Sequence, residues 1–204
     1  MQSVGFIGLG NVGGKLAGSL LRNKCQLMVR DLEITVAQPF IYAGATWAES
    51  PKIMAEQCDI VITCLPSPAA SAAVMEADDG ILAGLSDGKI WAEMSTTDAA
   101  EVTRLGALVK EHGADPVDCP VSGGCHRAAT GNIAIFAGCD RPVFEKILPF
   151  LTILGCWRST FSLKKVTDIT EKVANIMILS PTSLIGHHHK IANITLSPIS
   201  LLPI

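Results

Sequence analysis

Three glycines with the spacing of a phosphate-binding loop follow the first apolar run of the chain. The segment reads Gly8-Leu9-Gly10-Asn11-Val12-Gly13 and precedes a helical pattern over residues 11–21. Gly8 would allow a tight turn, Gly10 would let a pyrophosphate approach the backbone, and Gly13 would let the helix pack closely on the strand. A glycine-rich turn without a ligand is the alternative. The strand before the motif and the helix after it favour dinucleotide binding.

A carboxylate follows the second apolar run, at the place where a dinucleotide's ribose would lie. Residues 26–30 are largely apolar and end in Asp31, which stands eighteen positions after Gly13. Asp31 could accept hydrogen bonds from both ribose hydroxyls. The same charge would repel a 2′-phosphate, which favours NAD over NADP, whereas the neighbouring Arg30 could swing to bind that phosphate. We therefore expect NAD as the cofactor, with NADP as the alternative.

Apolar runs and helical patterns alternate through the chain, which predicts a doubly wound α/β fold of Rossmann type around a parallel sheet. After the two segments above, the pattern indicates four more pairs of a strand and a following helix. The strands fall within 42–47, 59–65, 89–94 and 131–138, and the helices that follow them cover 50–57, 67–76, 98–112 and 141–154. Thr97 is expected to cap the helix over 98–112.

Two further segments should meet the glycine motif at one edge of this sheet. Leu65 and Pro66 end one predicted strand, and Ser95 and Thr96 end the next. Open α/β sheets bind their ligands along the carboxyl ends of the strands. These residues are therefore expected to line one crevice together with the loop at residues 8–13.

A segment with a serine and two glycines could bind an anion. In Ser122-Gly123-Gly124 no side chain beyond the serine crowds the backbone. Its amides and its hydroxyl are therefore free to hold a carboxylate or an oxyanion. An ordinary glycine turn is an equally good interpretation from these residues alone.

Composition restricts the partners that the chain can have. The 204 residues carry a formal charge of −3 and contain no block of basic residues, so we expect no nucleic-acid partner. No apolar stretch reaches the roughly 20 residues of a membrane span, and Met1 is followed almost at once by the first predicted strand. We therefore expect a cytoplasmic protein without a membrane partner.

Thiols and histidines suggest no metal centre. The seven cysteines contain no CxxC pair and resemble small buried hydrophobic residues of a reducing compartment. Cys125, next to the serine and glycine segment, is the one that could be a reactive thiol. His187, His188 and His189 are adjacent, and adjacent histidines rarely form a closed site without further ligands.

Five segments, in order, together resemble one enzyme family. They are GFIGLGNVGG, the strand that ends in Asp31, ITCLPSP, EMSTT and DCPVSGGCHRAATGNIAIFAG. Over residues 1 to about 155 the chain resembles the 3-hydroxyisobutyrate dehydrogenase family of β-hydroxyacid dehydrogenases, whose NAD-binding domain is similar to that of 6-phosphogluconate dehydrogenase.

The resemblance implies roles for several residues of the crevice. Leu65 and Pro66 would line the cofactor, and Thr96 would contact the region of the nicotinamide ribose or ring. Ala70 stands where some family members offer a polar cofactor contact. The substrate's carboxylate and hydroxyl would be held by Ser122, Gly123 and Gly124.

Family chemistry is a reversible hydride transfer between C3 of a small 3-hydroxy acid and the nicotinamide, with a lysine as general acid and base. The segment EKVANIM at residues 171–177 resembles the family's lysine helix, which makes Lys172 the first choice and Asn175 its neighbouring polar contact. The family's second asparagine position is Ile176 here. A rival alignment uses Lys164, and the absence of a working lysine is the third alternative.

We expect residues 1–160 to form the dinucleotide-binding domain and residues 161–204 to be a remnant of the interdomain helix with an irregular tail. Residues 156–162 lack the family's glycine-rich turn, and the chain from Ser180 onward does not resemble the family's second, helical domain. A changed reading frame or an early stop would explain this. The first functional hypothesis is an NAD-dependent dehydrogenase, and the alternative is a cofactor-binding module without turnover. Apolar surface left exposed would favour a homo-oligomer.

Overall fold

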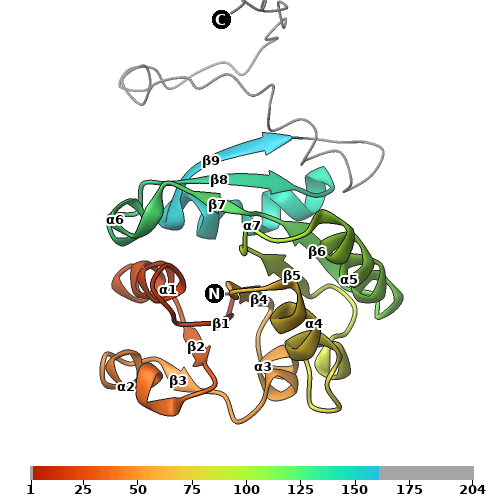
Figure 1. Ribbon diagram of the computed structural model, residues 1–204, viewed down its shortest axis with the longest axis horizontal. Coiled ribbons are helices and arrows are strands. Elements are labelled where there is room, and N and C mark those ends of the chain that lie inside the picture. The colour runs from red at the N-terminus through yellow and green to blue at the C-terminus, as the bar shows by residue number, and fades with distance from the viewer. Residues whose placement is uncertain (1, 161–204) are drawn as a thin grey trace, which may run out of the picture.

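One sheet organises the described part of the chain, residues 2–160 of the computed structural model (Figure 1). Six parallel strands form its larger part in the order β3-β2-β1-β4-β5-β6. They are β1 (Val4–Ile7), β2 (Leu27–Arg30), β3 (Thr46–Trp47), β4 (Ile60–Thr63), β5 (Ile90–Glu93) and β6 (Asp115–Asp118). This is the strand order of dinucleotide-binding folds, with its switch point between β1 and β4. The predicted Rossmann-type fold is confirmed.

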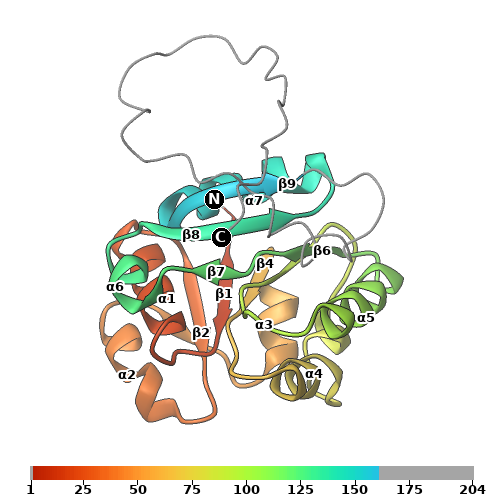
Figure 2. The ribbon, with the colours of Figure 1, turned by 45° about the horizontal axis from the view of Figure 1, so that its top comes forward.

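Three more strands extend the sheet and make it mixed. They are β7 (Val121–Ser122), β8 (Ile133–Gly138) and β9 (Gly155–Thr160). Strand β8 runs antiparallel to β6 and β7, and β9 pairs with β8 in parallel (Figure 2). The short connection between β6 and β8, which holds β7 and one helix of six residues, leaves no room for a full crossover helix. The chain therefore turns back along the sheet edge.

Helices cover both faces of the sheet (Figure 1). One face packs against α1 (Gly13–Arg22), α2 (Ile34–Tyr42), α6 (Gly124–Ala129) and α7 (Arg141–Leu154). The other packs against α3 (Pro51–Gln57), α4 (Pro68–Glu76), the 3-10 turn η1 (Leu82–Gly84) and α5 (Ala99–Glu111). Alternation along the strands separates the two cores, since Ile62 and Ala92 face the first and Val61 and Trp91 face the second. No helix within residues 2–160 is long and apolar enough to cross a membrane.

Helix starts follow the expected chemistry at two places and differ at a third. Ser50 and Ser67 cap α3 and α4 by accepting backbone N–H bonds, and each is followed by proline. The prediction that Thr97 caps α5 is wrong, because the helix begins one residue later. Asp98 is the cap, and its Oδ1 accepts the N–H of Glu101 at 3.0 Å.

Candidate functional site

A cleft of about 730 Å³ opens at the carboxyl ends of the central parallel strands. This volume lies in the range of sites for small ligands and cofactors. The cleft brings together residues of the three segments that were expected to converge on one crevice, and Asp31 lines it as well. Of the residues predicted to bind a cofactor, its lining contains Gly8, Gly10, Asn11, Val12, Gly13, Asp31, Leu65, Pro66 and Thr96.

The three motif glycines meet different requirements. Gly8 has a φ of +94°, and a Cβ there would collide with the carbonyl oxygen of Cys64. At Gly13 a Cβ would collide with the carbonyl oxygen of Gly8, so the helix packs closely on the loop. At Gly10 a Cβ would meet no atom within 4 Å. Packing within the described chain therefore requires Gly8 and Gly13, whereas Gly10 leaves open space that faces the cleft.

The start of α1 is suited to an anion. No side chain caps this N-terminus, and the first turn contains no acidic residue. The positive end of the helix dipole therefore lies next to the open space at Gly10, with no acidic residue in the first turn of the helix to neutralise it. A diphosphate is the kind of group that this arrangement fits.

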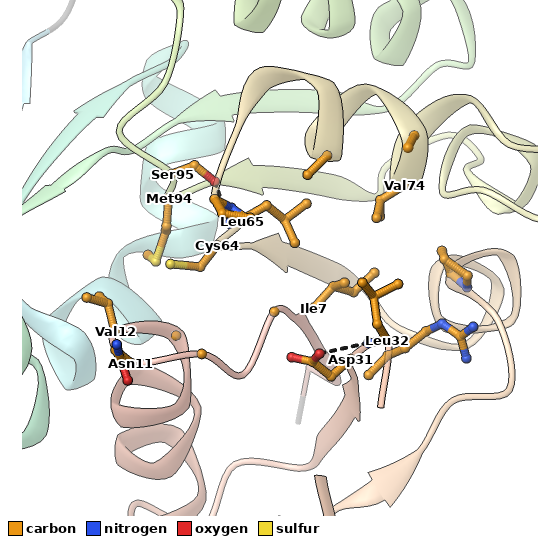
Figure 3. Close-up of a pocket in the computed structure, with 18 of the residues that line it drawn as sticks. Ile7, Asn11, Val12, Asp31, Leu32, Cys64, Leu65, Val74, Met94 and Ser95 are labelled. Atoms are coloured by element: carbon orange, nitrogen blue, oxygen red, sulfur yellow. Dashed lines mark hydrogen bonds between the residues drawn. The ribbon is translucent and has the colours of Figure 1, made fainter. Parts of the chain in front are cut away.

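Asp31 is held in a defined orientation at the end of β2. Its Oδ2 accepts the N–H of Leu9 at 2.6 Å. Its Oδ1 accepts the N–H of Leu32 at 2.8 Å (Figure 3). Leu9 itself, predicted as a cofactor contact, has a side chain that is only 5 % exposed and that packs in the core. Its contribution to the site is the amide that orients Asp31.

Arg30 is engaged on the side of β3. Its Nη1 donates to the carbonyl oxygens of Ala48 at 2.8 Å and Glu49 at 2.6 Å, and its guanidinium lies 5.4 Å from the ring centre of Trp47. A swing toward a ribose phosphate would break all three contacts.

The wall opposite Asp31 is formed by the ends of β4 and β5 and by α4. Figure 3 shows Leu65 and Val74 facing Ile7 and Leu32 across the cleft. The N–H of Leu65 donates to Ser95 Oγ at 2.7 Å. Ala70 lines this wall as well, and its methyl side chain offers no polar contact to a ligand in the cleft.

The predicted substrate segment adjoins the cleft at Thr96. The Thr96 hydroxyl donates to the carbonyl oxygen of Val121 at 3.0 Å, and both residues line the cleft. Ser122, Gly123 and Gly124 follow directly, are exposed, and lie outside this lining. The two glycines have φ values of +128° and +76°, so the backbone turns sharply where β7 meets α6.

One buried and one half-buried acid end the neighbouring strands β5 and β6, and both were missed by sequence reasoning. Glu93 ends β5 with no exposed surface, and Asp118 ends β6 as its register partner. Burial raises the pKa of Glu93. Burial, and then the charge of Glu93, raises the pKa of Asp118 to about 7. The sequence signal that could have found them is an acidic residue directly after an apolar run, in WAE at residues 91–93 and in PVD at residues 116–118.

Several predicted residues lie outside the described part of the chain: Lys164, Lys172, Asn175 and His187 to His189. Within residues 2–160 no group of three or more His, Cys, Asp or Glu side chains is placed to hold a metal ion. Cys125 is exposed, whereas Cys58 and Cys119 are buried.

Comparison with known proteins agrees with this geometry. The family described as the NAD binding domain of 6-phosphogluconate dehydrogenase matches residues 3–170. Glyoxylate/succinic semialdehyde reductase 2, chloroplastic, of Arabidopsis thaliana is 31% identical over 80% of this chain and 45% of its own length. Mitochondrial 3-hydroxyisobutyrate dehydrogenase of Rattus norvegicus is 34% identical over 90% of this chain and 54% of its own.

A solved structure shows the same fold. Psf3 in complex with NADP+ and 2-OPP superimposes with a TM-score of 0.77 and 27% identity, over 82% of this chain and 60% of that one. The chain spans about half the length of the curated relatives named above. The chain belongs to the family of NAD-binding domains of 6-phosphogluconate dehydrogenase, and its resemblance to the 3-hydroxyisobutyrate dehydrogenases is confirmed.

Proposed function

We propose that the cleft binds a nicotinamide adenine dinucleotide and that the protein is an NAD-dependent dehydrogenase of small 3-hydroxy acids. The observation that carries the proposal is the open space at Gly10, between the uncapped start of α1 and the oriented carboxylate of Asp31. A dinucleotide needs these features in this order, because its diphosphate lies beside a ribose with two hydroxyls.

Placement of the two ends of the cofactor follows from the lining. Asp31 would accept the hydroxyls of the adenosine ribose, and the diphosphate would lie along the loop at Gly10. The nicotinamide end would then reach Thr96 and Val121, which adjoin Ser122. The serine hydroxyl and the glycine amides beyond it would hold the carboxylate of a hydroxy acid next to the nicotinamide.

Cofactor choice favours NAD for two electrostatic reasons. The carboxylate of Asp31 would face a 2′-phosphate directly, and Arg30, the nearest cation on β2, is held by two carbonyl oxygens and a tryptophan ring. The NADP+ bound to Psf3 makes NADP the alternative. Fluorescence titration with NADH and NADPH distinguishes them. Arg30→Ala should leave NADPH affinity unchanged, whereas a clear loss would show that Arg30 does swing to the phosphate.

The reaction needs a proton acceptor in addition to the cofactor. When bound, nicotinamide supplies the hydride acceptor for C3 of the substrate. The hydroxyl proton would pass to the amine of Lys172, with Asn175 orienting the substrate, on the strength of the segment at residues 171–177. Lys164 is the rival position.

NADH production from a panel of small 3-hydroxy acids tests the proposal on the full chain. Lys172→Ala should abolish turnover while NADH affinity stays nearly unchanged, and Lys164→Ala is its matched control. A wild-type protein that binds NADH without oxidising any hydroxy acid would be a cofactor-binding module without turnover. A protein that binds neither NADH nor NADPH would refute the cofactor site itself.

A further inference from the structure

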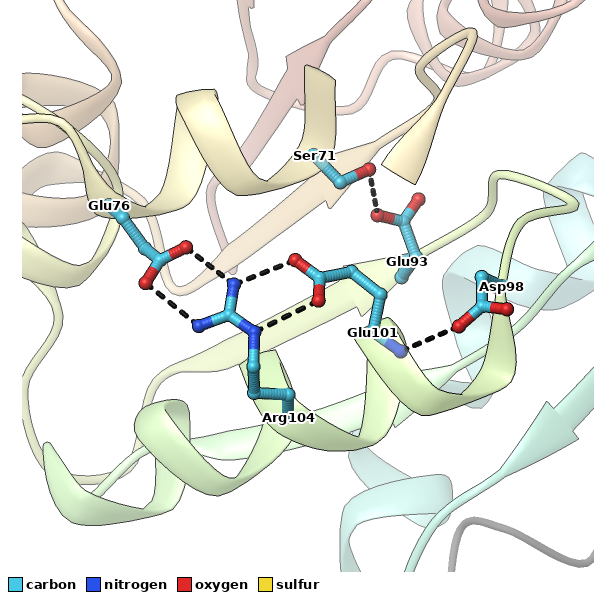
Figure 4. A network of polar contacts seen from close by, with 6 residues as sticks. All are labelled: Ser71, Glu76, Glu93, Asp98, Glu101 and Arg104. Atoms are coloured by element: carbon cyan, nitrogen blue, oxygen red, sulfur yellow. Dashed lines mark hydrogen bonds and ion pairs between the residues drawn. The ribbon is translucent and has the colours of Figure 1, made fainter. Parts of the chain in front are cut away.

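A buried carboxylate connects three of the elements that form the wall of the cleft opposite Asp31. Glu93 Oε1 accepts the N–H of Ser95 at 2.8 Å. Glu93 Oε2 accepts the hydroxyl of Ser71 at 2.9 Å, a bond that Figure 4 shows. Ser71 lies on α4 and Ser95 follows β5. Ser95 in turn accepts the N–H of Leu65, which follows β4. One chain of hydrogen bonds therefore runs from α4 through Glu93 to the backbone of Leu65.

Burial makes this chain of bonds strong and directional. Glu93 and Thr63 have no exposed surface, Ser71 is 1 % exposed and Ser95 is 4 % exposed. The Thr63 hydroxyl is a further hydrogen-bond partner of Glu93, and it also accepts Trp91 Nε1–H at 3.0 Å. Hydrogen bonds in the low-dielectric interior, away from water, are electrostatically stronger than the same bonds in water. A buried acid without these partners would be strongly destabilising.

The position of Glu93 suggests more than structural support. Leu65 and Ser95 both line the cleft, whereas Glu93 lies behind them and does not. Figure 3 shows Ser95 pointing toward Leu65 at this wall. We propose that Glu93 is a positioning residue, which fixes Ser95 and the backbone of Leu65 in the geometry that receives the cofactor. This inference rests on the proposed cofactor site.

Helix α4 is attached to its neighbours by a contact at the surface and by a buried contact, and only the buried one belongs to the hydrogen-bond chain through Glu93. At the surface Arg104 of α5 binds the carboxylates of Glu76 on α4 and of Glu101 (Figure 4). These groups are largely in contact with water, so their pairing contributes little. The buried contact between Ser71 and Glu93 is therefore the one that sets how α4 lies against the ends of β4 and β5.

Amide hydrogen exchange measured by NMR tests the positioning without any cofactor. In Glu93→Ala, the amides of Ser95 and Leu65 should exchange at least about tenfold faster relative to the core amides of β1, because both lose their acceptor or its support. In Glu93→Gln, the side-chain oxygen still accepts from Ser95 and both amides should stay protected. Unchanged protection of Leu65 in Glu93→Ala would overturn the proposal.

NADH affinity, measured by fluorescence titration of the full chain, tests the consequence for the site. Ser71→Ala should raise the Kd about three- to fivefold and Glu93→Ala about tenfold or more, because the first variant loses one buried hydrogen bond of the wall and the second loses two. Glu93→Gln should restore affinity to within about threefold of the wild type.

The matched control is Ser19→Ala. Ser19 is also a buried helical serine, 2 % exposed, whose hydroxyl bonds another element, the carbonyl oxygen of Ala128 at 3.3 Å. This variant should lose similar stability without a change in Kd. Equal effects of Ser71→Ala and Ser19→Ala on Kd would reduce Glu93 to a structural residue. A wild-type protein that does not bind NADH would refute the cofactor site instead. Hydrogen exchange would still show whether Glu93 positions Ser95 and the backbone of Leu65.

Discussion

Replacing Asp118 by asparagine should stabilise the protein at neutral and alkaline pH. The carboxyl lies half-buried beside the buried Glu93, and its pKa rises from 3.8 to about 7. Folding therefore favours the protonated acid. Asparagine has nearly the same shape as the protonated acid and carries no charge at any pH.

The size of the stabilisation follows from the change in the pKa of Asp118 on folding. About three pKa units at 1.36 kcal/mol each give a ceiling of about 4 kcal/mol. Water that reaches the half-buried carboxyl reduces this value, so we expect about 2 kcal/mol. Because the pKa of Asp118 is raised in the folded state, the stability that this group contributes is fully present below pH 4 and is lost as the pH rises toward 7. Asp118→Asn should match the wild type near pH 4 and exceed it at pH 8.

Urea denaturation followed by circular dichroism between pH 4 and 8, at constant ionic strength, measures the difference. Glu76 and Glu101, whose pKa values Arg104 lowers, change stability in the opposite direction, but they are present in both proteins and cancel. The exposed Asp78→Asn serves as the control and should show no such divergence. If the stability difference between Asp118→Asn and the wild type is the same at pH 4 and pH 8, the reasoning fails.

Two further predictions concern the glycines of the cofactor loop and the cysteines of the chain. Gly10→Ala should keep the wild-type melting temperature and lose NADH affinity, because its new methyl group meets only cleft space. Gly13→Ala should lower the free energy of unfolding by about 2 kcal/mol or more, because its methyl group collides with backbone. Thermal unfolding and NADH titration check both variants, and a Gly10→Ala protein that binds NADH normally would count against the site. In the native protein, maleimide should label the exposed Cys125 before the buried Cys58, since burial raises the pKa of the Cys58 thiol to about 11. Mass spectrometry of peptides measures the order in which the two thiols are labelled, and early labelling of Cys58 would contradict the prediction.

Local chemistry made the cofactor loop and its strand recognisable from sequence. The glycine spacing, the apolar run before it and Asp31 are all short-range signals, and the structure places them as expected. Helix α2 was missed because its sequence, ITVAQPFIY, combines β-branched residues with Pro39 and contains no charge. Strand β9 was missed because a strand at a sheet edge depends on its neighbour, here β8.

The hydrogen-bond chain through Glu93 could not be predicted from sequence, because its residues come together only through tertiary packing. Glu93 and Ser71 are separated by 22 positions, and Leu65 and Ser95 by 30. In sequence, Glu93 is an acidic residue at the end of a strand, a place where solvent exposure is the ordinary expectation. Only the fold shows that α4 covers it.

The two attachments of α4 differ in their sensitivity to salt. The surface contacts of Arg104 lie within reach of dissolved ions, which screen them at a Debye length of about 8 Å at physiological ionic strength. The bond between Ser71 and Glu93 is sealed from the same ions. Concentrated salt should therefore weaken only the outer attachment of α4, while the buried bond between Ser71 and Glu93 keeps the inner wall of the cleft in place.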